Sequence, residues 1–395
     1  MWLRAGRLTG ARCRIAAAMN LPTVQYARTG DGLNIAYAEL GVGPSIVFAS
    51  NIFGSLHFYQ QALTRARNER QGRIRAGRRR TSSTGPLVDQ LIQLGWGVVL
   101  HDIRGMGSSS RSAEDLSLDR RVEDIEAVAD KLGLRRFVMA GFDYGSATAI
   151  AYAARHPGRV SHLVLRAPWL SGSGKSAVPA VRIATSPESM HWSSLRKGEH
   201  RAWEVFCHVI GSVMTGFGDE EGARRLAADI LLSTSPETLM AFYEHSDRIE
   251  LGDAARALRV PTLVVHETDF SFGSLELAQE VASSITGARL VIVNKPSAGE
   301  LFVDSAAEID RFLRLNAASG EAVEAARLAR SPAPLTPREA QVLRLIANGL
   351  TNYEIAGRLT VSERTVGRHI TNLYGKIGAR SKAEATAYAI RQGLT

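Results

Sequence analysis

The sequence is poor in cysteine and has no long apolar run, and each absence excludes a class of protein. Cysteine occurs at Cys13 and Cys207 alone, which is too few for a disulfide scaffold and fits a reducing compartment. No apolar stretch approaches the roughly 20 residues that a membrane span needs. Because 45% of the residues are hydrophobic, the chain can bury a large core, and its 395 residues are enough for more than one domain. The two absences lead us to expect a cytoplasmic protein with no membrane partner.

The net charge of +9 is concentrated in three basic segments. Residues 1–19 carry +4, residues 62–80 carry +7 and residues 334–395 carry +5, which leaves −7 on the rest of the chain. Clustered positive charge is typical of surfaces that bind nucleic acid. For the first two segments a solvated tail or loop is the plainer interpretation. We therefore predict a disordered arm over 1–21, without a signal peptide, and a mobile arginine-rich insertion over 62–84.

Short β-branched runs alternate with helix-length segments through most of the chain. The runs occupy residues 45–50, 97–102, 136–141, 162–167, 261–266 and 288–293, and helices are expected at 118–131, 144–155 and 275–285. Two earlier runs, VQYART and LNIAYAEL, predict an antiparallel start to the sheet. The alternation predicts the α/β class, with a mostly parallel sheet covered by helices on both faces.

Two regions break this alternation. Residues 170–256 lack strand signals but contain helical patterns and scattered aromatic side chains. They predict a helical cap above the carboxyl edge of the sheet, where ligands bind in such folds. Residues 315–334 are alanine-rich and end in Ser-Pro-Ala-Pro, which indicates a linker. The predicted domains are thus an α/β domain over 22–314 and an all-α, four-helix domain over 335–395.

The helix starts of the last segment are unusually explicit. Thr336, Thr351 and Ser381 are each followed three residues later by glutamate, which is the capping-box pattern. Ser362 can cap a further helix, whose apolar face carries Val366, Ile370, Leu373 and Ile377. Three residues separate that helix from the preceding one, residues 352–359. This arrangement predicts a helix-turn-helix whose second helix enters the major groove of DNA.

The same segment resembles the LuxR-type DNA-binding domain. The resemblance rests on LTPRE, the series Gly349, Asn352, Glu354, Ile355 and Ala356, then SERTV, His369 and KIGARS. It implies double-stranded DNA as a partner, read by a homodimer at paired half-sites. It also implies base contacts by Gly367, Arg368 and Thr371, and phosphate contacts by Arg364, Thr365, Asn372 and Lys376. Gly367 departs from the basic residue more usual there, and a four-helix module that binds protein is the alternative.

The segment AGFDYGSA, residues 140–147, has the G-x-x-x-G outline of a nucleophile elbow with Asp143 at its centre. With HDIRGMGSSS and HPGRVSHLVL it resembles the α/β-hydrolase fold, over roughly residues 24–313. In haloalkane dehalogenases and epoxide hydrolases an aspartate holds this place. There it forms an ester that a histidine-activated water then hydrolyses. In this chain Tyr144 replaces the tryptophan that follows the aspartate.

The histidine that such a triad needs is missing from its expected place. No histidine lies between His266 and His369, and the expected position falls near Ala298. Asp269 is the candidate for the acid, although the best-matching register puts Phe270 there. His101 and His266 each end a strand and stay open as displaced bases. The predicted ligand pocket comprises Asn51, Ile52, His101, Asp143, Tyr144, Trp169 and His266, with backbone N–H groups of Ile52 and Tyr144 as oxyanion donors.

A complete helix-turn-helix beside an incomplete triad favours a transcription regulator. In this hypothesis its hydrolase-like domain senses a small molecule without turning it over, and the chain uses no metal or cofactor. Two alternatives stay open. One is a DNA-tethered hydrolase with Asp143 as nucleophile and His101 or His266 as base. The other is a DNA-bound scaffold without a ligand, which uses the arginine-rich insertion to hold a partner or more DNA.

Overall fold

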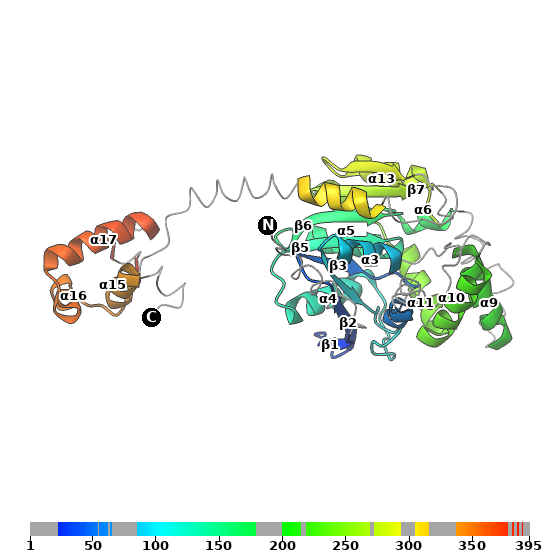
Figure 1. The fold of residues 1–395 in the computed structure, drawn as a ribbon, viewed down its shortest axis with the longest axis horizontal. Helices are drawn as coiled ribbons and strands as arrows, with labels where there is room; N and C mark the ends of the chain where they lie inside the picture. The colour runs from blue at the N-terminus through cyan, green and yellow to red at the C-terminus, as the bar shows by residue number, and fades with distance from the viewer. Residues whose placement is uncertain are drawn as a thin grey trace, which may run out of the picture. The chain divides into compact units, whose positions relative to one another are not determined.

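The computed structural model describes the larger part of the chain. The described residues are 23–53, 55–61, 64, 85–178, 200–214, 219–268, 272–293, 305–315 and 337–377, with 381, 382, 385, 386 and 389. They belong to two compact units that divide between Leu313 and Arg314 (Figure 1). The predicted N-terminal arm, almost all of the arginine-rich insertion and the linker lie outside the described residues, so these remain predictions.

One sheet of eight strands organises the described part of the N-terminal unit, in the order β1-β2-β4-β3-β5-β6-β7-β8. β1 and β2 are antiparallel, β2 is antiparallel to β4, and every other pair is parallel, as the sequence predicts. The strands are β1 (Gln25–Arg28), β2 (Asn34–Leu40), β3 (Ser45–Ala49), β4 (Gly97–His101), β5 (Phe137–Phe142), β6 (Val160–Arg166), β7 (Thr262–Glu267) and β8 (Arg289–Val293).

Each face of this sheet has its own apolar core, because alternate strand residues point to opposite faces. Val47, Val99 and Met139 belong to one core, and Ile46 and Val98 to the other. The first core includes residues of α4 (Leu118–Lys131), α5 (Tyr144–Arg155), α12 (Gly252–Ala257) and α13 (Leu275–Ser284). The second includes α3 (Gly85–Gln93) and the helical residues 305–315. The predicted bounds of α4 and α5 are confirmed, and α13 ends one residue early.

The RGMGS motif after β4 forms a buried charge cluster rather than a catalytic group. The guanidinium of Arg104 is fully buried and lies 2.7 Å from a carboxylate oxygen of Asp124 and 2.8 Å from one of Asp31. Asp102 accepts hydrogen bonds of 2.7 Å from the backbone N–H of Ser108 and of Leu56. These contacts fix the loops at the carboxyl edge of the sheet, since breaking a buried pair leaves an uncompensated charge.

Helices occupy the described part of the predicted cap, and α9 and α10 lie side by side (Figure 1). Asp229 of α10 accepts a 2.5 Å hydrogen bond from the Ser55 hydroxyl, which joins the cap to the loop after β3. The cap helices are α6 (Gly172–Ser176), α9 (His200–Met214), α10 (Glu220–Ser233) and α11 (Pro236–Asp247). The cap is therefore anchored to the sheet domain at the loop after β3, the strand that pairs with β5.

The C-terminal unit has a separate apolar core. Its described helices are α15 (Pro337–Ala347), α16 (Asn352–Leu359) and α17 (Glu363–Ile377), and Lys382, Ala385, Thr386 and Ala389 are helical where the fourth helix is predicted. Val342, Ile355, Val366 and Leu373 are all fully buried in this core. Of the predicted apolar face of α17, Val366 and Leu373 are buried and Ile370 packs against them, whereas the side chain of Ile377 lies outside the described residues. No helix in the described ranges combines the length and apolar character that crossing a bilayer requires.

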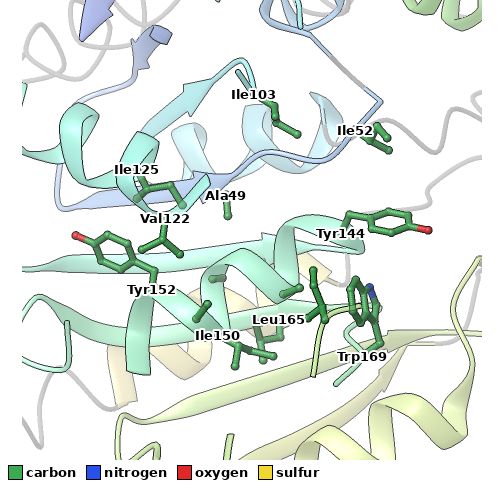
Figure 2. Close-up of a cluster of buried hydrophobic side chains, with 14 of the residues drawn as sticks. Ala49, Ile52, Ile103, Val122, Ile125, Tyr144, Ile150, Tyr152, Leu165 and Trp169 are labelled. Carbon is green, nitrogen blue, oxygen red and sulfur yellow. The ribbon is translucent and has the colours of Figure 1, made fainter. Parts of the chain in front are cut away.

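Glycines allow the turn between β5 and α5 to pack against the sheet. A Cβ atom on Gly145 would lie 2.2 Å from the carbonyl oxygen of Ala49 in β3, and one on Gly141 would lie 2.6 Å from that of Gly145. Real Cβ atoms essentially never approach backbone atoms so closely. A larger residue at either position would therefore collide with the backbone of the sheet or of the turn. Ala49 and the α5 residue Ile150 belong to the same buried core, which is drawn in Figure 2.

We expect Gly145→Ala to lower the free energy of unfolding by about 2–3 kcal/mol, since overpacking a tight contact forces the backbone to move. Gly158→Ala is the matched control, because its new Cβ meets nothing within 4 Å. The control should change stability by less than about 0.5 kcal/mol. Chemical denaturation of both variants measures the difference. Equal stabilities would show that α5 does not depend on this close approach to β3.

Candidate functional site

Asp143 lies at the turn between β5 and α5, in a backbone conformation that non-glycine residues rarely adopt. Its φ and ψ angles are 52° and −117°, and its N–H donates a 2.9 Å hydrogen bond to the carbonyl oxygen of Arg166. Its own carbonyl accepts a 2.5 Å hydrogen bond from the Ser146 hydroxyl. A left-handed φ costs free energy that the surrounding structure must offset. The elbow geometry that the sequence predicts at Asp143 is thus present.

The Asp143 carboxylate forms an ion pair with Lys175, a residue that the sequence analysis did not select. Lys175 lies on α6 at the start of the cap, and its side chain is 1% exposed while that of Asp143 is 5% exposed. The Lys175 ammonium also donates a hydrogen bond to the backbone carbonyl of Phe272. Both charges are therefore removed from water and are compensated by each other.

The electrostatics of Asp143 follow from this burial. Burial raises the pKa of the Asp143 carboxyl, while the Lys175 ammonium and the Asn51 side chain oppose that rise. A buried carboxylate without a partner is costly, so the ion pair is what allows the charged form to persist beneath the cap. A carboxylate held in this way is a weaker nucleophile than a free one, because its lone pairs are engaged by a cation.

Aromatic side chains surround the ion pair. The Tyr144 ring lies 5.6 Å from Trp169, 5.4 Å from Phe242 and 5.6 Å from Tyr243, measured between ring centroids. The Lys175 ammonium lies 5.4 Å from the centroid of Tyr144. Figure 2 shows Tyr144 and Trp169 next to one another beyond the end of β5. Ring faces attract cations, so this cluster further stabilises the ammonium.

A second buried cation, Arg121 of α4, lies on the far side of this aromatic cluster. Its guanidinium carbon lies 4.6 Å from the centroid of the Phe242 ring. Burial lowers the pKa of Arg121 to about 10. Arg121 was also missed by the sequence analysis, because an arginine in an amphipathic helix is normally expected on the solvent face.

One of the predicted oxyanion donors is engaged within the protein. The Ile52 N–H donates a 2.8 Å hydrogen bond to the side-chain oxygen of Asn51. An oxyanion hole requires N–H groups that point at the reacting oxygen. In this structure the Ile52 donor is already satisfied, so both the predicted nucleophile and one predicted donor have partners inside the chain.

His101 and His266 lie on strands that do not pair with β5. His101 ends β4 and His266 is in β7, and in each case one strand separates them from β5. Strands are about 4.8 Å apart, so these backbones lie roughly 10 Å from that of β5, and any contact with Asp143 would have to be made by the side chains. Within the described residues neither histidine is hydrogen-bonded to Asp143. The displaced-base hypothesis therefore gains no geometric support.

The environments of the two histidines also favour their neutral forms. Burial lowers the pKa of His101 to about 4, and burial lowers the pKa of His266. Nδ1 of His101 lies 3.4 Å from the Ser50 hydroxyl, so this side chain has a local partner. Asp269, Phe270 and the expected triad position near Ala298 lie outside the described residues. The described ranges contain no cluster of three or more potential metal ligands.

The helix-turn-helix is built by capping interactions that the sequence predicts. Thr351 and Glu354 form a reciprocal capping box at the start of α16, and the Ser362 hydroxyl accepts a 3.2 Å hydrogen bond from the Thr365 N–H at the start of α17. Thr360 ends α16 in the left-handed conformation, with φ 53°. Thr336 and Glu384, which complete the other two predicted boxes, lie outside the described residues.

The predicted DNA-reading residues of α17 lie on its open face where they are described. The side chains of Arg364 and Arg368 are exposed, and Thr365 and Gly367 are half-buried. A Cβ on Gly367 would meet nothing within 4 Å, so this position leaves space on the reading face. The side chains of Thr371, Asn372 and Lys376 are outside the described part of the helix. The assigned base and phosphate contacts remain predictions.

Two known families match separate parts of the chain. Residues 333–389 match the bacterial regulatory proteins of the LuxR family. Residues 81–191 match the α/β-hydrolase fold family. The first match covers the helix-turn-helix, and the second includes both the RGMGS motif and the elbow.

Individual curated proteins show the same division. Transcriptional regulatory protein YdfI of Bacillus subtilis is 45% identical over 65 residues, which are 16% of this chain and 30% of YdfI. A Mycobacterium bovis protein whose name describes it as an HTH-type transcriptional regulator is 46% identical over 70 residues. These residues are 18% of this chain and 8% of that protein. The chain thus spans less than a third of these regulators. The AB hydrolase superfamily protein YisY of Bacillus subtilis is 25% identical over 213 residues, 52% of this chain and 75% of YisY.

Solved structures resemble the larger part of the chain in fold. A bromoperoxidase from Bacillus anthracis superposes with a TM-score of 0.54 at 16% identity, covering 74% of this chain and 98% of that chain. A thermophilic esterase from Thermogutta terrifontis gives a TM-score of 0.53 at 18% identity, with the same coverage. At such identities the likeness establishes the fold alone. The chain therefore joins an N-terminal α/β-hydrolase domain to a C-terminal LuxR-type helix-turn-helix domain.

Proposed function

We propose that this protein is a DNA-binding transcription regulator whose hydrolase-like domain binds a small molecule without turning it over. The LuxR-type domain implies DNA binding, and the exposed arginines of α17 support it as the reading helix. The regulator acts in the cytoplasm as a homodimer, since helix-turn-helix domains commonly read paired half-sites. The N-terminal unit then binds the small molecule, and the C-terminal unit binds DNA.

The ion pair between Lys175 and Asp143 is the observation that best supports a domain without turnover. An ester-forming aspartate must present a free lone pair to its substrate and must then be released by an activated water. Here the carboxylate is paired with a buried ammonium, and within the described residues neither His101 nor His266 is hydrogen-bonded to it. Asp143 therefore serves as a charged partner in a polar contact rather than as a nucleophile.

A small molecule can regulate DNA binding only if it favours one arrangement of the protein over another. Helix α6 of the cap can respond to a ligand in this way, because its residue Lys175 contacts the elbow while α6 itself lies outside the sheet. A ligand that engages the elbow changes the contact between α6 and α5. We infer that this contact is where ligand occupancy is converted into a structural change.

A DNA-tethered hydrolase is the second candidate. It is favoured by one observation, the strained elbow backbone of Asp143, which is the conformation that positions a nucleophile. The ion pair and the positions of the two histidines weigh against it. Turnover measurements separate the two candidates directly.

Arg368→Ala should weaken binding of the full chain to a specific duplex by roughly 10- to 100-fold, as expected for a base-reading arginine. The duplex is obtained by enrichment from a random library with the wild-type chain. Arg344→Ala in α15 is the matched control, because it removes the same charge from an exposed position on another helix. Fluorescence anisotropy at several salt concentrations measures both. Equal losses in the two variants would mean that net charge, and not the α17 face, governs affinity.

Wild-type protein should give no multiple turnover with a panel of esters, epoxides and haloalkanes, and Asp143→Ala should behave identically. The physical reason is the paired carboxylate, to which no histidine of the described residues is hydrogen-bonded. Product formation and intact protein mass are followed together. Multiple turnovers that disappear in Asp143→Ala would establish a working hydrolase and refute the proposal. A single adduct at Asp143 without turnover would leave the absence of turnover standing but refute the role of Asp143 as a charged partner only.

A further inference from the structure

The surroundings of the Lys175 ammonium are those of an ammonium-binding site. Three kinds of group contact it: the Asp143 carboxylate, the backbone carbonyl of Phe272 and the face of Tyr144, whose centroid is 5.4 Å away. A negative charge, a neutral acceptor and a ring face are the groups that bind a primary ammonium ion in a desolvated site. The elbow, which holds a reacting group in hydrolases, here holds a cation.

The cation reaches this site on a short, separately anchored segment. In α6 and its N-cap, Ser171 donates a 2.9 Å hydrogen bond to a Glu250 carboxylate oxygen, and Ser176 donates one of 2.6 Å to Asp247. The N–H of Gly172 donates a 2.8 Å hydrogen bond to the carbonyl of Ile249. These contacts join α6 to the end of α11 and the residues that follow it. Lys175 is thus the point at which this part of the cap touches the elbow.

Charge compensation restricts what can replace the Lys175 ammonium. Withdrawing it leaves the Asp143 carboxylate buried without a partner, which is strongly destabilising. A neutral or anionic molecule does not remedy this, whereas a molecule with its own ammonium group restores the pair. The rings of Tyr144, Phe242 and Tyr243 stand beside the site and favour a cation over a neutral hydroxyl group.

A further buried polar atom lies beside the site. Trp169 is fully buried and packs edge-on against Tyr144, and its indole N–H has no hydrogen-bond partner in the described part of the chain. An unsatisfied buried donor costs free energy, which an acceptor on a bound molecule would recover. A ligand that carries an oxygen acceptor as well as an ammonium group meets both requirements.

We propose that the elbow is a binding site for small primary alkylammonium compounds, which exchange with the side chain of Lys175. Lys175 is the resident occupant in this structure, and a ligand amine takes its place on Asp143. The exchange breaks the contact between α6 and the elbow. The ligand therefore favours an arrangement of the cap in which α6 is detached from Asp143. This inference rests on the proposed function, because it names the chemical class that the sensing domain takes.

The test uses the full chain with Lys175→Ala, which deletes the atoms equivalent to n-propylammonium. That cation should bind the variant saturably and raise its unfolding temperature, as followed by calorimetry and thermal denaturation. 1-Propanol and propionate are the neutral and anionic probes and should have no saturable effect. In the Lys175→Ala, Asp143→Asn double variant the response to n-propylammonium should disappear, since the carboxylate is its partner.

Measurements on wild-type protein test whether n-propylammonium exchanges with the Lys175 side chain. n-Propylammonium should bind it saturably but at least roughly tenfold more weakly than Lys175→Ala, because the tethered lysine competes. Lys175→Met fills similar space without a charge and leaves Asp143 unpaired, so it should bind n-propylammonium more tightly than wild type, and it serves if the alanine variant does not fold. Binding to Lys175→Ala but never to wild type would make Lys175 a permanent structural partner and overturn the exchange. Binding that survives in the double variant would overturn the assigned site.

Measuring DNA affinity in the same samples separates this inference from the proposed function. If the amine binds at Asp143 and DNA affinity does not change, the ammonium site stands and its link to DNA binding fails. If the amine does not bind, while a compound of another class changes DNA affinity, sensing stands and the ammonium site is refuted.

Discussion

The buried ion pair between Lys175 and Asp143 is the interaction on which the character of the N-terminal unit depends. A carboxylate at the end of β5 is held in place by a strained turn and the packing of α5, and its charge must be compensated away from water. The chain supplies the cation from α6, a different element. The ion pair therefore joins the cap to the sheet domain at the point where a hydrolase would hold its substrate.

Two further buried groups, Arg104 and Asp102, are also compensated within the chain. Arg104 is paired with Asp124 and Asp31, and Asp102 accepts backbone N–H groups from two loops, so the hydrolase-like motif after β4 persists as architecture. These contacts keep the carboxyl edge of the sheet ordered whether or not chemistry takes place there. A fold that needs its loops fixed for catalysis can therefore retain them for binding.

The regular elements and the elbow could be predicted from the sequence, because each is specified locally. The bounds of α4 and α5 follow from periodicity and capping, and the glycines at 141 and 145 indicate a close helix-to-strand approach that the Cβ distances bear out. The same holds for the α16 capping box and the inward face of α17. Lys175 and Arg121 could not be predicted, since a cation in a glycine- and serine-rich segment or on an amphipathic helix gives no sign of being buried.

The sequence by itself determined which domains the chain contains, where the aspartate replaces the usual nucleophile and that no histidine lies between His266 and His369. Those features depend on short-range patterns and on residue identity. Only the tertiary structure decided what stands opposite Asp143, which of the histidines are near it and which N–H groups are already engaged. Such pairings depend on contacts between residues far apart in the chain, for which local sequence carries no signal.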